Sequence, residues 1–397
     1  MVETADFVIV GGGTIGGWAS VFAAADGAGR VVVLEREEAG IGASSRAAGV
    51  VRAQGGTPET VALGMWSIDF YRHQRDAFGT DSGFRELGYI ILARTRADER
   101  AGRDRVAMQR GAGLDAQWLS APEACAVNPT LAGEGHRGGS YFAGDGCIDP
   151  PRNVRAYSLA MQRAGVELLE HTAFVGVRTS KGRVTGVETP DGVIATERVL
   201  LTGGPSLRAV GKHVGARVLV GAVRHQVAVS EPHPAFAVDR LPMVFDLTAG
   251  LYWRLEEGGL LWGMSNPNEP PGEAREIDAA HLRKMQRRLG RIVPATAGLG
   301  IRKSWAATIE YCPDHLPILG PVITTAGETL GGVTLATASG HGMMWGPAVA
   351  RVAADLALVG ATTVTDVSRF GMDRFDEHGR SPLYDPIALP FPVGADE

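Results

Sequence analysis

The N-terminal part of the chain alternates between short apolar runs and a longer stretch of small residues. Phe7–Val10 is a continuous apolar run with the length of a buried strand. The stretch from Thr14 to about Asp26 is rich in glycine and alanine and ends at Gly27, so we predict a helix that packs closely on a sheet. A second apolar run lies within residues 30–37 (RVVVLERE). The order strand, helix, strand predicts a βαβ unit.

Later segments alternate apolar and polar residues in the manner of half-buried strands. Residues 222–229 (AVRHQVAV) contain His225, and residues 251–263 (LYWRLEEGGLLWG) have the pattern of a hairpin. Alternate side chains of a strand point to the same face, which places Tyr252 and Arg254 together. We therefore expect a second sheet, and its polar side chains are candidates for meeting a substrate.

The basic segment His281–Ile292 has helical periodicity. Leu282, Met285, Leu289 and Ile292 recur at 3-4-3 spacing, which predicts the apolar stripe of an amphipathic helix. The basic residues between them are then a solvated face. We do not interpret this segment as a nucleic-acid-binding surface.

Composition and charge narrow the class of protein. The 397 residues are 45% apolar and 21% charged, as in a globular chain large enough for two domains. A net charge of −5 offers no field for binding polyanions. The three cysteines, Cys125, Cys147 and Cys312, lack the spacing of a zinc site or a disulfide framework. The N-terminus has no basic segment before an apolar one, and no apolar run reaches the ~18 residues of a membrane span, so we expect a cytoplasmic protein.

A glycine motif lies between the first predicted strand and helix. Gly11, Gly13 and Gly16 form G-x-G-x-x-G, and Glu35 ends the second predicted strand nineteen residues after Gly16. Strand, tight turn, helix and acidic residue together are typical of a dinucleotide site, in which the acid accepts hydrogen bonds from a ribose. The alternative, a glycine-rich turn in an ordinary βαβ unit, does not account for Glu35.

The next segment favours a flavin over a nicotinamide. Residues 40–56 (GIGASSRAAGVVRAQGG) form a long loop with Arg46 and Arg52 where a nicotinamide-binding domain would continue into a helix. A second nucleotide fingerprint is missing from residues 202–211 (TGGPSLRAVG), which argues against nicotinamide-coupled chemistry.

Seven features, in this order, give the chain a resemblance to a known family. They are the N-terminal motif with Glu35 and the segments at residues 146–177, 182–204, 251–263, 304–321 (SWAATIEYCPDHLPILGP), 338–358 (ASGHGMMWGPAVARVAADLAL) and 368–375. The chain resembles the FAD-dependent amine oxidoreductases of the D-amino acid oxidase superfamily, above all the sarcosine oxidase, glycine oxidase and dimethylglycine dehydrogenase branch.

The resemblance implies an α/β fold in two domains. A Rossmann-like FAD-binding domain would comprise residues 1–80, 150–218 and 325–397. An antiparallel-sheet substrate domain would comprise residues 81–149 and 219–324. The proline-rich tail, residues 376–397, is expected to be extended over a neighbour or partly disordered.

The resemblance also implies the cofactor contacts. They are Gly11, Gly13, Thr14, Ile15, Gly16, Glu35, Arg36, Ser44, Ser45, Arg46, Ala48, Gly49, Val50, Val175, Thr202, Gly203, Gly204, Gly340, His341, Gly342, Met343 and Met344. The turn around His341 precedes a helix with Pro347 in its first turn, and the positive end of that helix would stabilise an anionic reduced flavin. The alternative is that His341 is only a structural turn residue. Met343 and Met344 are interpreted as pocket lining, and no metal site is predicted.

Catalysis in such enzymes is chiefly placement of an amine, whose hydride moves to flavin N5 to give an imine that water hydrolyses. Seven residues are candidates for the substrate pocket: Arg52, His225, Tyr252, Arg254, Glu310, His341 and Trp345. For His225, Tyr252, Arg254 and Glu310 the alternative is an ordinary place in a sheet, in a core or in an ion pair.

Departures from the family pattern carry information about the chemistry. Ala307 and Arg46 stand where relatives attach the flavin covalently, so FAD should be bound non-covalently. Ile309 and Met343–Met344 stand where relatives place additional cations for a substrate carboxylate, which leaves Arg52. A residue near Leu261 takes the place of an oxygen-activating lysine, which makes a dehydrogenase about as plausible as an oxidase.

We therefore expect oxidation of the C–N bond of a secondary or N-methylated amine or amino acid. The electrons would pass to oxygen or to a redox protein, and a homo-oligomer is possible. One alternative is oxidation of a 2-hydroxy acid on the same scaffold. Another is a flavin-binding subunit of a heteromeric electron-transfer complex.

Overall fold

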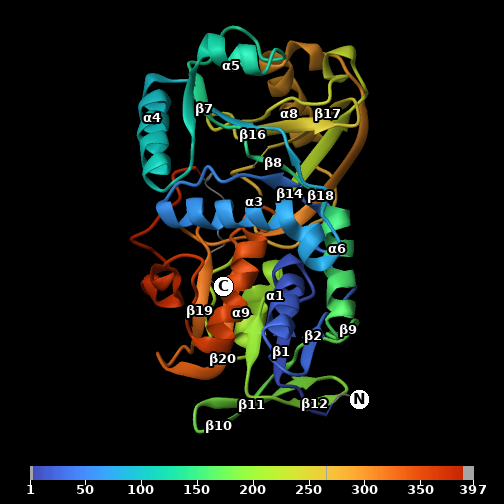
Figure 1. The fold of residues 1–397 in the computed structure, drawn as a ribbon, viewed down its shortest axis with the longest axis vertical. Helices are drawn as coiled ribbons and strands as arrows, with labels where there is room; N and C mark the ends of the chain where they lie inside the picture. The colour runs from blue at the N-terminus through green and yellow to red at the C-terminus, as the bar shows by residue number, and fades with distance from the viewer. Residues whose placement is uncertain (1–2, 265, 388–397) are drawn as a thin grey trace.

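The protein is built around two large sheets. A computed structural model describes residues 3–264 and 266–387. Figure 1 shows the two sheets one above the other along the long axis, with the long helix α3 (Pro58–Phe78) crossing between them. This α/β architecture confirms the predicted fold class.

The lower sheet has nine strands in the order β10-β11-β20-β13-β1-β2-β9, with β12 beside β11 and β19 beside β20. Its strands are β1 (Phe7–Val10), β2 (Val31–Leu34), β9 (Glu167–Leu169), β10 (Gly176–Ser180), β11 (Arg183–Thr189), β12 (Gly192–Ala195), β13 (Val199–Leu201), β19 (Ile318–Ile323) and β20 (Thr329–Thr337). The central strands β9, β2, β1, β13 and β20 pair in parallel. The strands β1 and β2 are buried along their whole length, as their continuous apolar runs predict.

Helices α1 (Thr14–Ala25), α6 (Pro150–Arg163) and α9 (Gly346–Val359) pack together on this sheet. Small residues permit the close approach. A Cβ on Gly17 would lie 2.5 Å from the ring of Tyr157, so a larger residue would push α6 away. The predicted βαβ unit of β1, α1 and β2 is confirmed.

The upper sheet has eight strands in the order β18-β14-β17-β16-β15-β5-β7-β6. They are β5 (Tyr89–Leu92), β6 (Gln117–Ser120), β7 (Gly138–Phe142), β14 (Gly221–Ser230), β15 (Met243–Asp246), β16 (Leu251–Glu256), β17 (Gly259–Met264) and β18 (Ile301–Tyr311). Neighbouring strands run antiparallel, except that β5 and β15 are parallel, so the sheet is mixed where the sequence predicted an antiparallel one.

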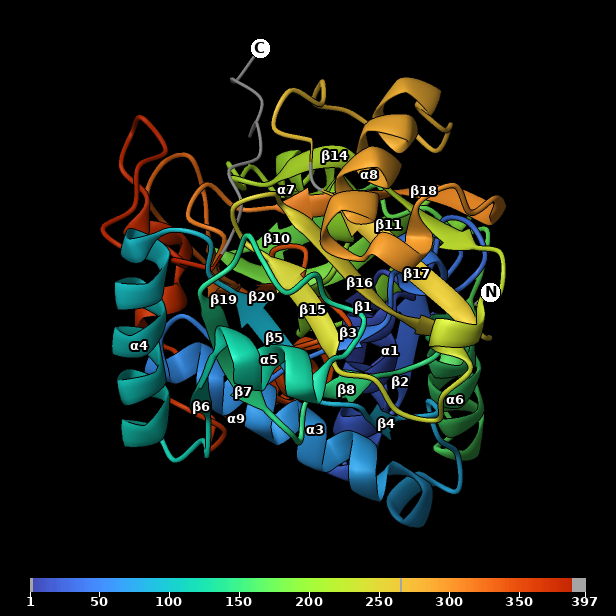
Figure 2. The same ribbon diagram turned by 90° about the horizontal axis from the view of Figure 1, so that it is seen from above.

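Helices α4 (Arg96–Gly111), α5 (Ala121–Val127) and α8 (Ala279–Ile292) cover the outside of the upper sheet. Figure 2 shows α4 beside β6 and β7 and α8 beside β14. The predicted apolar stripe of α8 is confirmed, because Leu282, Met285, Leu289 and Ile292 are buried against the sheet.

Short elements connect the two halves. A three-stranded sheet joins β3 (Val50–Val51), β8 (Gly146–Cys147) and β4 (Arg85–Glu86). The short helices are α2 (Ala43–Arg46) and α7 (Leu207–Lys212). Strand β19 pairs with β20 of the lower sheet, although the predicted boundary at residue 325 placed it in the other domain. The exact domain boundaries stay a prediction.

Candidate active site

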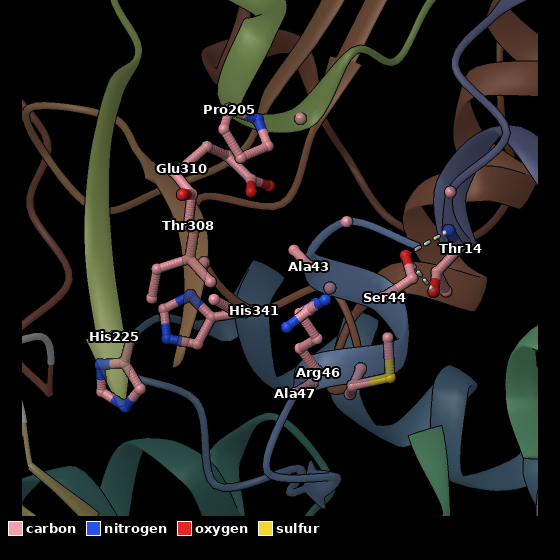
Figure 3. Close-up of a pocket in the computed structure, with 18 of the residues that line it drawn as sticks. Thr14, Ala43, Ser44, Arg46, Ala47, Pro205, His225, Thr308, Glu310 and His341 are labelled. Carbon is pink, nitrogen blue, oxygen red and sulfur yellow. Dashed lines mark hydrogen bonds between the residues drawn. The ribbon is translucent and has the colours of Figure 1, made fainter. Parts of the chain in front are cut away.

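One cavity runs between the two sheets. Its first end is lined by the start of α1, by Glu35 and by the loop after β2, and its second end by strands of the upper sheet. Figure 3 shows Thr14 and Ser44 at one end, His225 at the other, and Arg46 and His341 between them. The cavity is therefore long enough to join the glycine motif to side chains of the second sheet.

The glycine turn brings the backbone close to the neighbouring strand. Gly11 has φ +106°, and a Cβ there would lie 2.7 Å from the carbonyl oxygen of Thr202. A Cβ on Gly16 would lie 2.0 Å from the carbonyl oxygen of Gly11. Only glycine fits both places, and the turn thereby presents its backbone to the cavity.

The N-terminus of α1 faces the cavity. Its N-cap, Gly13, has no side chain to satisfy the first N–H groups, and Gly13, Thr14 and Ile15 all line the cavity. The N–H of Thr14 donates to Oγ of Ser44 at 2.9 Å, and Oγ1 of Thr14 donates to the same atom at 3.1 Å. Because Gly13 supplies no side-chain cap, the N–H groups of the first turn and the helix dipole make this a place for a pyrophosphate.

Glu35 follows directly after β2 and lines the cavity. Its Oε2 accepts from the N–H of Gly12 at 2.8 Å and its Oε1 from the N–H of Glu37 at 2.9 Å. These bonds hold the carboxylate beside the glycine turn, where an adenosine ribose would be recognised.

His341 lies in the turn before α9. Its ring lies against the buried ring of Trp345, with centroids 4.1 Å apart and the ring planes tilted by 30°. Burial, reinforced by the nearby charge of Arg52, lowers the pKa of His341 to about 3, so the imidazole is neutral. Tyr71 donates from its hydroxyl to the carbonyl oxygen of Met343 at 2.9 Å, which fixes the turn from α3.

Arg52 is a buried cation in the cavity wall, with 3% of its surface exposed. Its Nη1 donates to the carbonyl oxygen of Gln54. The residues that follow Arg52 are held by buried Asp145, which accepts from the N–H of Ala53 at 2.6 Å and from the Gln54 amide at 2.9 Å. Burial raises the pKa of Asp145 to about 7, although these bonds and the charge of Arg52 act to lower it.

His225 on β14 and Tyr252 on β16 form a pair across β17 of the upper sheet. Nε2 of His225 lies 2.8 Å from the Tyr252 hydroxyl, and the two rings are nearly parallel at a centroid distance of 5.7 Å. Burial, with a contribution from the nearby His281, lowers the pKa of His225 to about 4. Both residues line the cavity and present neutral polar groups to it.

Glu310 also lines the cavity, from β18. It is buried, and its Oε1 accepts from Oγ1 of Thr337 at 3.3 Å. Burial raises the pKa of Glu310. Figure 3 shows it close to Pro205, on the side of the cavity formed by the turn after β13.

Most of the predicted site residues lie together on the cavity wall. From the predicted cofactor contacts these are Gly11, Gly13, Thr14, Ile15, Glu35, Arg36, Ser44, Arg46, Ala48, Gly49, Val50, Thr202, Gly203, Gly204, Gly340, His341, Gly342, Met343 and Met344. From the predicted substrate residues these are Arg52, His225, Tyr252, Glu310 and His341.

Five predicted residues lie off the wall. Gly16 packs behind the glycine turn, Ser45 lies in α2, and Val175 is 44% exposed. Trp345 supports His341 from behind. Arg254 is buried and donates from Nε to the carbonyl oxygen of Ala48 at 2.7 Å, so it holds the loop that forms the wall instead of facing the substrate.

Several lining residues have no recognisable signal in the sequence. Tyr89, Phe245 and Tyr311 come from strands whose apolar or aromatic character indicates only burial, and Ile387 comes from the tail. Glu273 and Arg275 line the cavity from residues 266–278, between β17 and α8. Glu273 pairs with Arg36 at 3.3 Å and Arg275 with Glu37 at 3.3 Å. These long-range pairs are visible only in the folded chain.

The described residues show few other chemical features. Within residues 3–264 and 266–387 no cysteine lines the cavity, and no group of three or more potential metal ligands is found. No helix in the same part of the chain combines the length and apolar character that a membrane crossing needs.

The glycine turn, the free N-terminus of α1 and Glu35 fit a bound dinucleotide, and the cavity extends from them to a second, substrate-sized region. The class defined by this arrangement is a dinucleotide-dependent oxidoreductase. The sequence profile of the family described as "DAO: FAD dependent oxidoreductase" matches residues 6–356. The chain belongs to this family and is an FAD-dependent oxidoreductase.

Similar proteins act in amine and amino acid oxidation. The chain is 30% identical to glycine oxidase of Geobacillus kaustophilus over 387 residues, which cover 94% of this chain and 98% of that one. It is 28% identical to 4-methylaminobutanoate oxidase (formaldehyde-forming) of Paenarthrobacter nicotinovorans, covering 95% of this chain but only 46% of that longer protein. The structure of L-proline dehydrogenase from P. horikoshii has the same fold, with a TM-score of 0.85, 24% identity and coverage of 94% of this chain and 97% of that one.

Proposed function

We propose that this chain oxidises the C–N bond of a secondary or N-methylated amine or amino acid. The observation that carries the proposal is the continuous cavity from the start of α1 to buried Arg52 and the side chains of the upper sheet. FAD bound in the first part supplies an acceptor for a hydride from the carbon next to nitrogen. The substrate loses this hydride and a nitrogen proton, and water hydrolyses the resulting C=N bond to a carbonyl compound and an amine.

Arg52 is the proposed anchor for a substrate carboxylate. A guanidinium binds a carboxylate through two parallel hydrogen bonds, and burial from water strengthens such a pair. Ile309 and Met344 also line the cavity and carry no charge. The substrate pocket therefore has fewer cations than the pockets of relatives that hold a substrate carboxylate with two cations. This favours a substrate with one carboxylate and a sizeable apolar part.

The state of the two cavity histidines argues against either of them as the base for a 2-hydroxy acid, which leaves Glu310, whose pKa burial raises, as the base that this alternative would need. Oxidation of a hydroxy acid requires a base for the hydroxyl proton, and a useful base has a pKa near the working pH. His225 and His341 have pKa values of about 4 and about 3 because they are buried. A neutral amine needs no such base, because it loses its hydride with the help of its own lone pair.

The type of electron acceptor is proposed from the residue at position 261, which is Leu261. This residue is buried in β17 with 1% exposure and packs with Val227 and Val229. No cation is therefore supplied by the position where the resemblance places an oxygen-activating lysine. This supports slow reaction with oxygen and electron transfer to another acceptor. FAD is proposed to be held without a covalent bond.

Product analysis tests the proposal. Purified enzyme is incubated with an N-methyl amino acid and an artificial electron acceptor, and then with air alone. We expect one carbonyl compound and one amine for every two electrons taken up by the acceptor, and slower turnover in air. Turnover of only the matching 2-hydroxy acid would contradict the proposal.

A further inference from the structure

The last described residues of the chain form part of the cavity wall. Ile387 lines the cavity and is 1% exposed. It belongs to one apolar cluster with Tyr89, Met243 and Phe245, all from strands of the upper sheet. Ile387 therefore lies at the substrate region of the cavity and not at the dinucleotide region.

Hydrogen bonds hold this segment in place. The N–H of Asp385 donates to the carbonyl oxygen of Asp314 at 3.0 Å, and Oδ1 of Asp385 accepts from the N–H of Ile387 at 3.0 Å. Asp314 in turn accepts two hydrogen bonds from Arg374, at 2.7 and 3.0 Å, in a buried ion pair. Asp385 and Ile387 are both buried, so these bonds hold Ile387 in the wall.

The apolar cluster adjoins the proposed carboxylate anchor. Arg52 lines the cavity together with Tyr89 and Ile387. Burial raises the pKa of Tyr89 and of Asp385, and the nearby charge of Arg52 opposes this at both residues. Tyr252, which is partly buried, packs against the same cluster. A carboxylate at Arg52 would thus leave the remainder of a substrate facing an aromatic and aliphatic surface.

We propose that Ile387 is a specificity-determining residue, which closes the apolar end of the substrate pocket and limits the size of the apolar group on a carboxylate-bearing amine. The inference rests on the proposed function for the identity of the substrate. It adds that the far C-terminal part of the chain, and not only the upper sheet, selects that substrate.

Binding of simple carboxylates tests this role without turnover. Acetate, isovalerate and phenylacetate are titrated into the FAD-loaded protein, and dissociation constants are taken from the change in flavin absorbance. The variants are Ile387→Ala and Ile387→Phe. Leu383→Ala is the matched control, because Leu383 lies in the same segment but packs against a different core cluster and does not line the cavity.

Ile387→Ala should tighten phenylacetate relative to acetate by about tenfold, since one or two methylenes in an apolar pocket change affinity by about 10- to 200-fold. Ile387→Phe should shift the ratio in the opposite direction, and Leu383→Ala should leave it unchanged. Equal ratios in all four proteins, or no carboxylate binding to the wild type, would overturn the inference. Melting temperature and flavin content identify a misfolded variant, and Ile387→Val then replaces Ile387→Ala.

The two proposals fail in different ways. If carboxylate ratios shift as expected but no N-methyl amino acid bleaches the flavin, the proposed function is wrong and the role of Ile387 in the pocket stands. If amines bleach the flavin but the ratios do not shift, Ile387 is not a specificity residue.

Discussion

Among single residues, Arg52 has the most specific predicted consequence. Replacing it with methionine keeps the length of the side chain and removes the charge. A hydrogen bond to a charged group contributes about 1.5–3 kcal/mol, so we expect kcat/KM for an N-methyl amino acid to fall about 10- to 100-fold. Steady-state kinetics with an artificial acceptor measures the change.

A substrate pair provides the control for Arg52→Met. The corresponding amine without a carboxylate should lose little, because it makes no ion pair with residue 52. An equal loss for both substrates would show that Arg52 supports the fold or the cofactor and does not bind a carboxylate.

The raised pKa of Asp145 predicts that the stability of the protein depends on pH. Burial raises the pKa of its carboxyl to about 7 in the folded protein, from an ordinary value of 3.8. The folded state therefore favours the protonated form, so this contribution to stability is complete below the unfolded pKa and is lost as the pH rises through about 7. The Asp145→Asn variant should lack this loss.

Thermal unfolding of the wild type and Asp145→Asn at several pH values between 5 and 8 checks this. The difference between the two melting temperatures should change in favour of the variant with rising pH. A difference that stays constant would mean that Asp145 is ionised throughout, held by Arg52.

At the residue scale, the types of residue at the site were predictable from the sequence. The directions in which their side chains point were only partly predictable. Arg52, His225 and Tyr252 face the cavity as alternation and resemblance predict. Arg254 shares the predicted face with Tyr252, but its length carries the guanidinium to the carbonyl of Ala48 and to Glu256. The role of Ile387 has no local signal, because it depends on contacts with strands far away in the sequence.

At the scale of elements, the packing of α1 on β1 depends on Gly16. A Cβ there would lie 2.0 Å from the carbonyl oxygen of Gly11 and 2.7 Å from Oγ1 of Thr202. Gly16→Ala should therefore displace the start of α1, at a cost of roughly 1–3 kcal/mol from overpacking. We expect weaker FAD binding by at least about tenfold, measured by flavin fluorescence on titration of the apoprotein.

Gly111→Ala is the matched control, because a Cβ at Gly111 near the end of α4 meets nothing within 4 Å. It should bind FAD as the wild type does. Wild-type affinity in Gly16→Ala would show that the turn does not hold the dinucleotide.

Elements with strong local patterns were predictable, and their connections were not. β1, α1 and β2 follow from apolar runs and a glycine turn, and α8 from its stripe. The segment between β17 and α8 lacks such a pattern. Residues 266–278 of this segment are placed by long-range bonds such as that from the N–H of Ala274 to Oγ1 of Thr308 at 3.0 Å.

For the whole molecule, the non-covalent state of FAD is a direct prediction. Arg46 and Ala307 line the cavity at the two places where the resemblance would put a covalent link. Denaturing the protein in acid should therefore release all of the yellow colour into the supernatant, which filtration and absorbance measure. Colour retained by the precipitated protein would contradict this prediction.

The two-sheet architecture was predictable because each half has its own pattern, buried parallel strands below and alternating strands above. The assignment of β19 and the course of the tail were not, because both depend on pairing between distant parts of the chain. β19 pairs with β20, and the described part of the expected extended or disordered tail packs against the upper sheet through Ile387. Residues 388–397 of that tail lie outside the described residues.

The central claim is oxidation of a C–N bond in the cavity between the sheets. The most direct test is an anaerobic titration of the FAD-loaded protein with matched pairs of N-methyl amino acids and 2-hydroxy acids. We predict that an N-methyl amino acid bleaches the oxidised flavin band and that its hydroxy counterpart does not. Bleaching by the hydroxy acid alone, or a purified chain that binds no FAD, would contradict the account.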